Sequence, residues 1–142
     1  MKKPFTLAFF AYLLPTFATG FIWHLVAFHD VYERLGIYRP EPIIPLGFAS
    51  MLVQGLIFAW AYPRLFDTAR EAWIGSALRA GLVFAALSWS FTTLAVAAKH
   101  PMASMPDYLL VETAFTAVQF TLVAPLMALA WRGRGSTRAS NR

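Results

Sequence analysis

Residues 108–131 read YLLVETAFTAVQFTLVAPLMALAW, and this stretch decides the fold. It carries one formal charge, at Glu112, and is apolar around the whole circumference of a helix. A helix that crosses the hydrocarbon core of a bilayer, about 30 Å thick, needs about 20 mostly apolar residues. We therefore predict a transmembrane helix over residues 108–131.

Three further stretches of the chain have the same character. They cover residues 5–28, 43–62 and 73–98, and the one formal charge within them is Arg79. The whole chain is 58% hydrophobic and 13% charged, which is more apolar surface than a small soluble domain can bury. We predict an all-α membrane protein, a four-transmembrane-helix bundle of two hairpins that forms one domain over residues 1–132.

The first stretch has an alternative interpretation. Lys2 and Lys3 precede its apolar run, as in a cleaved signal peptide, and Ala18 and Gly20 are small enough for a cleavage site. The run continues through residues 21–26, however, and is longer than a signal peptide needs. We expect the first stretch to remain in the protein as a span.

The lysine and arginine residues predict the orientation of the bundle, because the cytoplasmic ends of spans carry an excess of them. The four predicted spans place nine of these residues on the side of the two termini and three on the other side. The nine are Lys2, Lys3, Arg64, Arg70, Arg79, Arg132, Arg134, Arg138 and Arg142, and the three are Arg34, Arg39 and Lys99. We expect both termini in the cytoplasm, outward-facing polar loops in both hairpins, and a disordered basic tail over residues 133–142.

Local patterns predict where helices begin and end. Thr68 with Glu71, and Ser104 with Asp107, have the spacing of a capping box, so each pair should open a helix. The first helix should continue past the membrane and end at Gly36.

Small residues predict close helix packing. Ala77, Gly81 and Ala85 recur every four residues in the third predicted span, and Gly55 and Ala59 do so in the second. Such residues let the backbones of neighbouring helices approach in a membrane.

One pair of polar residues is the main candidate for a functional site. His24 and Glu112 each lie four residues inside the outer end of their predicted span, in the first and fourth helices. A rise of about 1.5 Å per residue places them at the same depth. Ionisable groups in a membrane are costly without a partner, and the matched depth permits a hydrogen bond or ion pair between these two inside the bundle. The favoured interpretation is that both side chains reach the membrane surface and anchor their helices there.

Two glutamines form a second matched pair. Gln54 and Gln119 each lie eleven residues in from the outer end of their predicted span, near the centre of the membrane. We expect both to face protein, where an amide bridges helices through a hydrogen bond worth about 1 kcal/mol. A structural role is the favoured interpretation.

The outer loops contain a candidate divalent metal site. His29 and Glu33 are four residues apart, so they share a helical face, and His100 or Asp107 would complete the ligand set. The alternative is that these side chains are simply solvated, since the set lacks a tight signature such as HExxH. We predict no other cofactor.

Several chemistries have no support in the chain. It has no cysteine, which excludes disulfides and thiol catalysis. We find neither a serine nucleophile signature nor a glycine-rich phosphate loop. The basic residues flank apolar segments, so no nucleic-acid partner is expected.

Four motifs lie between residues 20 and 63: GFIWH at 20–24, HDVYERLG at 29–36, PLG at 45–47 and QG at 54–55. With these motifs the chain resembles small uncharacterised bacterial four-helix integral membrane proteins. The resemblance implies a multi-pass protein of the bacterial cytoplasmic membrane. It implies no activity and no site residues.

Three functional classes follow from these observations. The first, which we favour, is a noncatalytic membrane protein, either an accessory subunit or a binder of lipid or small molecules, with the bilayer and a second copy or a larger complex as partners. The second is a small proton-coupled transporter or channel that acts as an oligomer. The third is a membrane enzyme or metal site at the outer face.

Overall fold

The computed structural model describes residues 2–39 and 41–134, so the predicted tail lies outside the described residues from position 135 onward. Within these ranges the chain is helical, with connecting turns and loops and no strand. Four helices are long and apolar enough to cross a membrane. They cover Lys3–Ala27, Ile44–Leu65, Trp73–Ala97 and Met105–Trp131, and each end lies within three residues of its predicted position.

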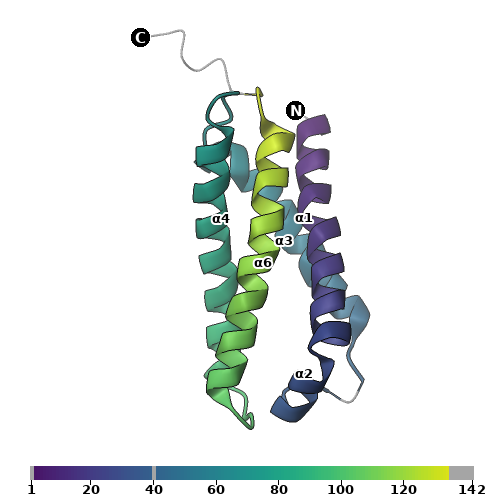
Figure 1. Cartoon of the computed structure of the whole chain (residues 1–142). Coiled ribbons are helices and arrows are strands. Elements are labelled where there is room, and N and C mark those ends of the chain that lie inside the picture. Colours follow the sequence, from purple (N-terminus) through teal and green to yellow (C-terminus); the bar gives the residue numbers. More distant parts are fainter. Residues whose placement is uncertain (1, 40, 135–142) are drawn as a thin grey trace.

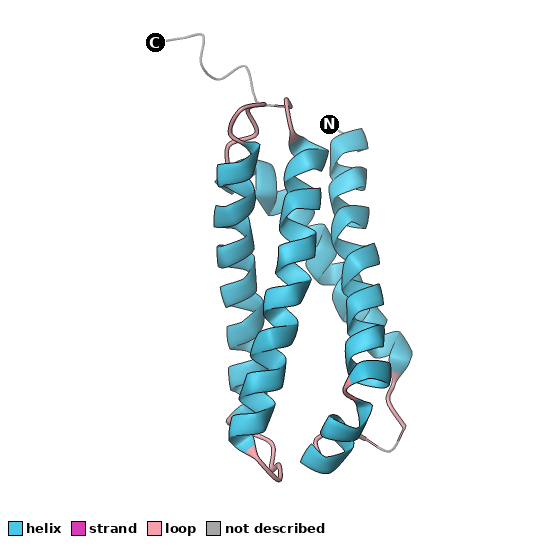
Figure 2. Ribbon diagram, viewed as in Figure 1, coloured by secondary structure: helices cyan, strands magenta, loops and turns pink. Residues whose placement is uncertain are grey.

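Two of these helices are interrupted by a short π-helical turn. The elements are α1 (Lys2–Ile22), η1 (Trp23–Ala27), α2 (His29–Leu35), α3 (Ile44–Leu65), α4 (Trp73–Trp89), η2 (Ser90–Leu94), α5 (Ala95–Ala97) and α6 (Met105–Trp131). The turn η1 is followed by the short helix α2, and η2 by the short helix α5. Figure 2 shows the long helices and the loops that connect them. Such π-helical turns are frequent at functional sites.

Helix α6 lies between α4 and α1 and packs along both, while α3 packs against α1 (Figure 1). Helix α1 begins and α6 ends at one end of the bundle, which we call the terminal end. The other end, which we call the loop end, holds α2 and the connection before α6 (Figure 1). The observed order is compatible with two antiparallel hairpins, α1 with α3 and α4 with α6.

The terminal half of the bundle is closed by a core of aromatic and aliphatic side chains. The rings of Phe58 on α3 and Phe84 on α4 stack with centroids 4.2 Å apart. Beyond the helix ends, the Gly133 backbone N–H donates to the Thr68 carbonyl at 2.9 Å. The core thus joins α1, α3, α4 and α6 at the terminal end.

Two glycines confirm the predicted close helix packing. A Cβ atom on Gly81 of α4 would lie 3.1 Å from the Cβ of Ala124 on α6. On α3, a Cβ atom on Gly55 would lie 3.0 Å from the Tyr12 ring and 3.2 Å from the Phe9 ring of α1. A larger side chain at either glycine would require the neighbouring side chains to shift.

The outer surface of the four long helices is strongly apolar. Phe91 is 76% exposed, and Leu82 and Leu110 are each 73% exposed. Side chains of this kind are favourable at a surface in contact with lipid rather than water.

Some predicted helix boundaries are confirmed. The Ser104 hydroxyl accepts the Asp107 backbone N–H at 3.4 Å and caps α6. Gly36 ends α2 with φ of +69°, a conformation that glycine adopts without strain. The first helix is not continuous to that point, however, because Phe28 leaves helical geometry after η1 and α2 begins anew at His29.

The predicted capping box at Thr68 and Glu71 is wrong. Helix α4 begins at Trp73, its N-cap position is Ala72, and no side chain caps it. Glu71 lies in a turn before the helix. The physical reason is tertiary, since the Thr68 backbone is bonded to the chain that follows α6 and so lies outside the helix.

Candidate functional site

A polar stripe runs along α1 and η1. It consists of Tyr12, Thr16, Gly20 and His24, which recur every four residues and therefore share one helical face. Each of the three side chains contacts a polar side chain from another helix. The stripe thus links α1 to both α3 and α6.

The two glutamines bind the middle of this stripe. The Tyr12 hydroxyl donates to Gln54 Oε1 at 2.5 Å, and Gln119 Nε2 donates to the Thr16 hydroxyl at 3.2 Å. The prediction that both amides face protein and bridge helices is confirmed by these bonds. Gln54 reaches α1 from α3 and Gln119 reaches it from α6, so each amide bonds to α1 rather than to the other amide.

At the loop end of the stripe, His24 meets Glu112. His24 Nε2 lies 3.2 Å from Glu112 Oε1, so the contact that their matched depth permits is present. The Tyr32 hydroxyl donates to the same carboxylate oxygen at 2.5 Å. Glu112 is 8% exposed and Tyr32 is fully buried, so the carboxylate lies inside the bundle and not at its surface.

The contacts of His24 constrain which of its two ring nitrogens carries a hydrogen. Its Nδ1 is 2.9 Å from the Gly20 carbonyl, which can only accept, so Nδ1 carries a hydrogen. Its Nε2 then faces a carboxylate oxygen, and two lone pairs would repel each other there. The 3.2 Å contact is therefore a hydrogen bond only when a hydrogen lies between Nε2 and the carboxylate oxygen.

Tyr32 is suited to remain the donor in this network. Burial raises its pKa well above the ordinary value, and the hydrogen bond to the Glu112 carboxylate raises it further. The Tyr38 ring stacks on it with centroids 4.9 Å apart. Helix α2 is held in place by the Ala103 backbone N–H, which donates to the Leu35 carbonyl at 3.0 Å.

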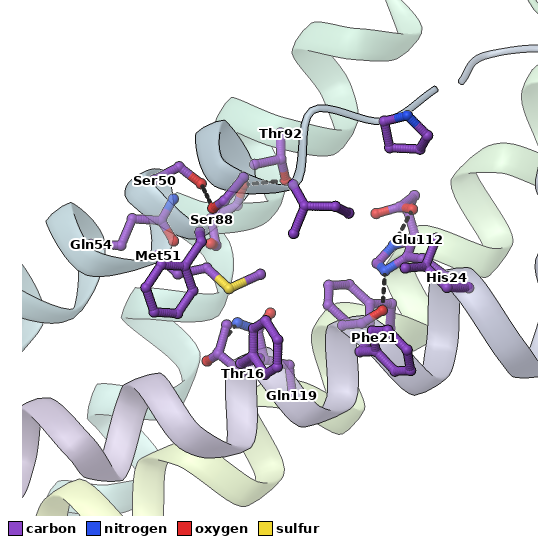
Figure 3. Close-up of a pocket in the computed structure, with 18 of the residues that line it drawn as sticks. Thr16, Phe21, His24, Ser50, Met51, Gln54, Ser88, Thr92, Glu112 and Gln119 are labelled. Atoms are coloured by element: carbon purple, nitrogen blue, oxygen red, sulfur yellow. Dashed lines mark hydrogen bonds and ion pairs between the residues drawn. The ribbon is translucent and has the colours of Figure 1, made fainter. Parts of the chain in front are cut away.

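The stripe and the His24–Glu112 pair line a cavity of about 530 Å³ between α1, α3, α6 and η2 (Figure 3). This is within the size range of small-molecule sites. Apolar side chains form most of its wall. They include Phe17, Phe21, Phe48, Met51 and Phe115.

The cavity exists because α3 and α4 do not close against each other near the loop end. Ser50 on α3 and Thr92 on η2 line it, yet each hydroxyl bonds within its own helix, to the carbonyls of Gly47 and Ser88, both at 2.7 Å. In Figure 3 the side chains of α3 face His24 and Glu112 across the cavity. The Phe58–Phe84 stack closes the bundle only nearer the terminal end.

A second hollow, of about 750 Å³, lies between α4 and α6. Small side chains such as Ala77, Gly81 and Ala117 form much of its wall, and the described residues that line it include no charged or histidine side chain. It lacks the convergent polar groups of a specific site. We therefore take the cavity beside His24 and Glu112, hereafter the polar cavity, as the candidate site.

The predicted metal ligands are only partly brought together. His29 Nε2 lies 3.3 Å from Glu33 Oε1, with both side chains at least half exposed. Neither His100 nor Asp107 joins them, and the described part of the chain holds no group of three or more possible ligands placed to bind a metal ion. A divalent metal site stays a prediction.

Four residues of the site were not predicted from the sequence. Tyr12 and Thr16 could have been found, because they precede His24 by multiples of four residues. Tyr32 had no such signal, since the break at Phe28 reorients α2. Arg39, in the loop before α3, lines the polar cavity as well.

The chain matches no protein-family model, no curated protein and no solved structure. The resemblance to small bacterial four-helix membrane proteins therefore stays a prediction. Any function has to be argued from the geometry of the site.

Proposed function

We propose that this protein is a noncatalytic membrane protein that binds a small amphiphilic molecule in the polar cavity. The observation that carries the proposal is the composition of the cavity wall, which is mostly apolar with polar groups at two levels. The His24–Glu112 pair forms the outer level, and Gln54 and Gln119 form the inner one. Apolar walls with a few placed polar groups are typical of small-molecule sites.

The ligand enters from the bilayer, between α3 and η2. This route is supported by the absence of any hydrogen bond between Ser50 and Thr92 within the described ranges, although both line the cavity. Entry from the other sides would require separating α1 from α3 or from α6, which pack along their lengths. A molecule dissolved in the bilayer would therefore reach the cavity without unfolding any part of the bundle.

The bundle lies in the bacterial cytoplasmic membrane with its terminal end in the cytoplasm. The positive-inside rule supports this orientation, because nine of the twelve lysine and arginine residues lie on the side of the termini. The bacterial location rests on the resemblance alone. A reporter enzyme fused to the C-terminus should report a cytoplasmic location. A report of an external location would mean that the orientation is the opposite one.

A cavity-filling variant tests the proposal. Gly47 lines the cavity, and a Cβ atom added there meets no atom within 4 Å, so Gly47→Trp should fill the space without disturbing the helices. Gly75→Trp is the matched control, because Gly75 of α4 also faces open space but lies outside the cavity.

The measurement is equilibrium binding of tritiated palmitate and hexadecanol to the purified protein in lipid nanodiscs. We expect saturable binding of at least one probe by the wild type and by Gly75→Trp, and a loss of about tenfold or more in Gly47→Trp. Equal binding by all three proteins, or no saturable binding of either probe, would overturn the proposal.

One observation favours a second function, proton-coupled transport by an oligomer. His24 and Glu112 bring two ionisable side chains into contact inside the bundle, as a proton relay requires. Four helices are few for a complete pathway, so a second copy would have to contribute. In proteoliposomes, Glu112→Gln should abolish proton flux while Asp107→Asn, at the exposed start of α6, retains it. Equal flux in the two variants would remove this function.

A further inference from the structure

We propose that the amphiphile bound in the polar cavity carries an anionic headgroup, a carboxylate or a phosphate, which binds Arg39 next to His24. This inference rests on the proposed function, since it specifies the ligand of the same cavity. It follows from the unpaired guanidinium of Arg39 on the cavity wall, from the position of Arg39 and from the length of the cavity.

The wall of the polar cavity has few ionisable side chains. Its acidic, arginine and histidine side chains are His24, Arg39 and Glu112. The first and last contact each other, with His24 Nε2 3.2 Å from Glu112 Oε1. Arg39 has no carboxylate within 4.0 Å and no hydrogen bond among the residues that the structure describes. Arg39 is exposed and its guanidinium has no partner among these residues, so it can pair with an anionic ligand.

Arg39 lies where a headgroup would be expected. It belongs to the connection between α2 and α3, at the loop end, whereas the apolar wall extends toward the centre of the bundle. The first turn of α3 lines the same end of the cavity through Ile43, Ile44 and Gly47, and this turn contains no acidic residue. The positive end of the α3 dipole therefore adds to the charge of Arg39. A cationic headgroup would be repelled by both.

The length of the cavity fits one chain from one leaflet. From His24 to Tyr12 the wall follows twelve residues of the first helix, or about 18 Å at 1.5 Å per residue. One leaflet contributes about half of the hydrocarbon thickness of about 30 Å. A single-chain amphiphile from the outer leaflet would therefore extend from Arg39 to the level of the two glutamines.

The experiment compares four probes on the purified protein in nanodiscs: palmitate, hexadecyl phosphate, hexadecanol and inorganic phosphate. We expect palmitate and hexadecyl phosphate to bind about tenfold or more tightly than hexadecanol, the effect of one charge-assisted hydrogen bond. Arg39→Gln should remove this preference, so that the three single-chain probes bind about equally. Arg34→Gln is the matched control, because Arg34 is an exposed arginine of the same loop end that does not line the polar cavity.

The outcomes separate the two proposals. Equal binding of hexadecanol and palmitate, unaffected by Arg39→Gln, would overturn the anionic headgroup and leave the binding function intact. Inorganic phosphate that binds as tightly as hexadecyl phosphate would overturn the amphiphile and identify a site for a free anion. Absence of saturable binding by every probe would overturn both proposals.

Discussion

Replacing Tyr32 with phenylalanine removes one oxygen atom from the interior of the bundle and leaves the ring in place. That oxygen donates to Glu112 Oε1 at 2.5 Å, in a position where Tyr32 is fully buried. A hydrogen bond to a charged group contributes about 1.5–3 kcal/mol to stability, whereas interhelical bonds in membranes average nearer 0.6 kcal/mol. Because the acceptor is a buried carboxylate, we expect Tyr32→Phe to lower the free energy of unfolding by about 1–3 kcal/mol.

Tyr38→Phe is the matched control for this prediction. The Tyr38 ring stacks on Tyr32 with centroids 4.9 Å apart, but its hydroxyl makes no hydrogen bond to any residue that the structure describes. Removing that hydroxyl should cost less than about 0.5 kcal/mol. Both variants keep the stacked rings, so the difference between them isolates the bond to Glu112.

Reversible unfolding in mixed micelles with increasing dodecyl sulfate, followed by tryptophan fluorescence, measures both free energies. A double-mutant cycle with Glu112→Leu adds a specific test, because Tyr32→Phe should cost almost nothing once the acceptor is gone. Equal losses for the Tyr32 and Tyr38 variants, or the same loss for Tyr32→Phe with and without Glu112, would refute the network.

Three further predictions concern pH and backbone packing. Because the folded pKa of Tyr32 is raised above 10.0, the stabilisation by its hydroxyl is complete below that pH and is lost as the pH rises. Tyr32→Phe should therefore make the decline in unfolding free energy above pH 10 shallower by up to about 1.4 kcal/mol per pH unit. Parallel curves for the variant and the wild type would contradict this. Gly81→Val should destabilise the α4–α6 contact by about 1–3 kcal/mol, because a Cβ atom on residue 81 would lie 3.1 Å from the Cβ of Ala124. The control Gly75→Val should not destabilise it. Equal melting temperatures of the two variants would count against the close packing of α4 on α6. Gly36→Ala should cost about 1–2 kcal/mol in the same unfolding assay because φ is +69°, and an unchanged value would mean that α2 ends differently.

The four long helices could be predicted from the sequence because hydrophobicity over about 20 residues is a strong local signal. The matched depth of His24 and Glu112, which permits their contact, could be predicted as well. Their depths follow directly from the helix boundaries, and few other ionisable residues lie within the apolar stretches.

The rest of the site depends on features that are not local in the sequence. The position of Tyr32 depends on the break at Phe28, which turns α2 back over the bundle. The true start of α4 depends on the contact of Thr68 with Gly133, far away in the chain. The cavity depends on how α3 and α4 separate, which side-chain packing decides and hydrophobicity does not report.

The central claim is that an amphiphile occupies the polar cavity, and photolabelling with a diazirine derivative of palmitate tests it most directly. Mass spectrometry of the labelled protein in nanodiscs should show modification at lining residues such as Phe17, Met51 and Phe115. An excess of unlabelled palmitate should suppress labelling there and leave it unchanged at outward-facing Leu82. Labelling of the cavity residues that palmitate does not suppress, or labelling confined to the outer surface, would contradict the account.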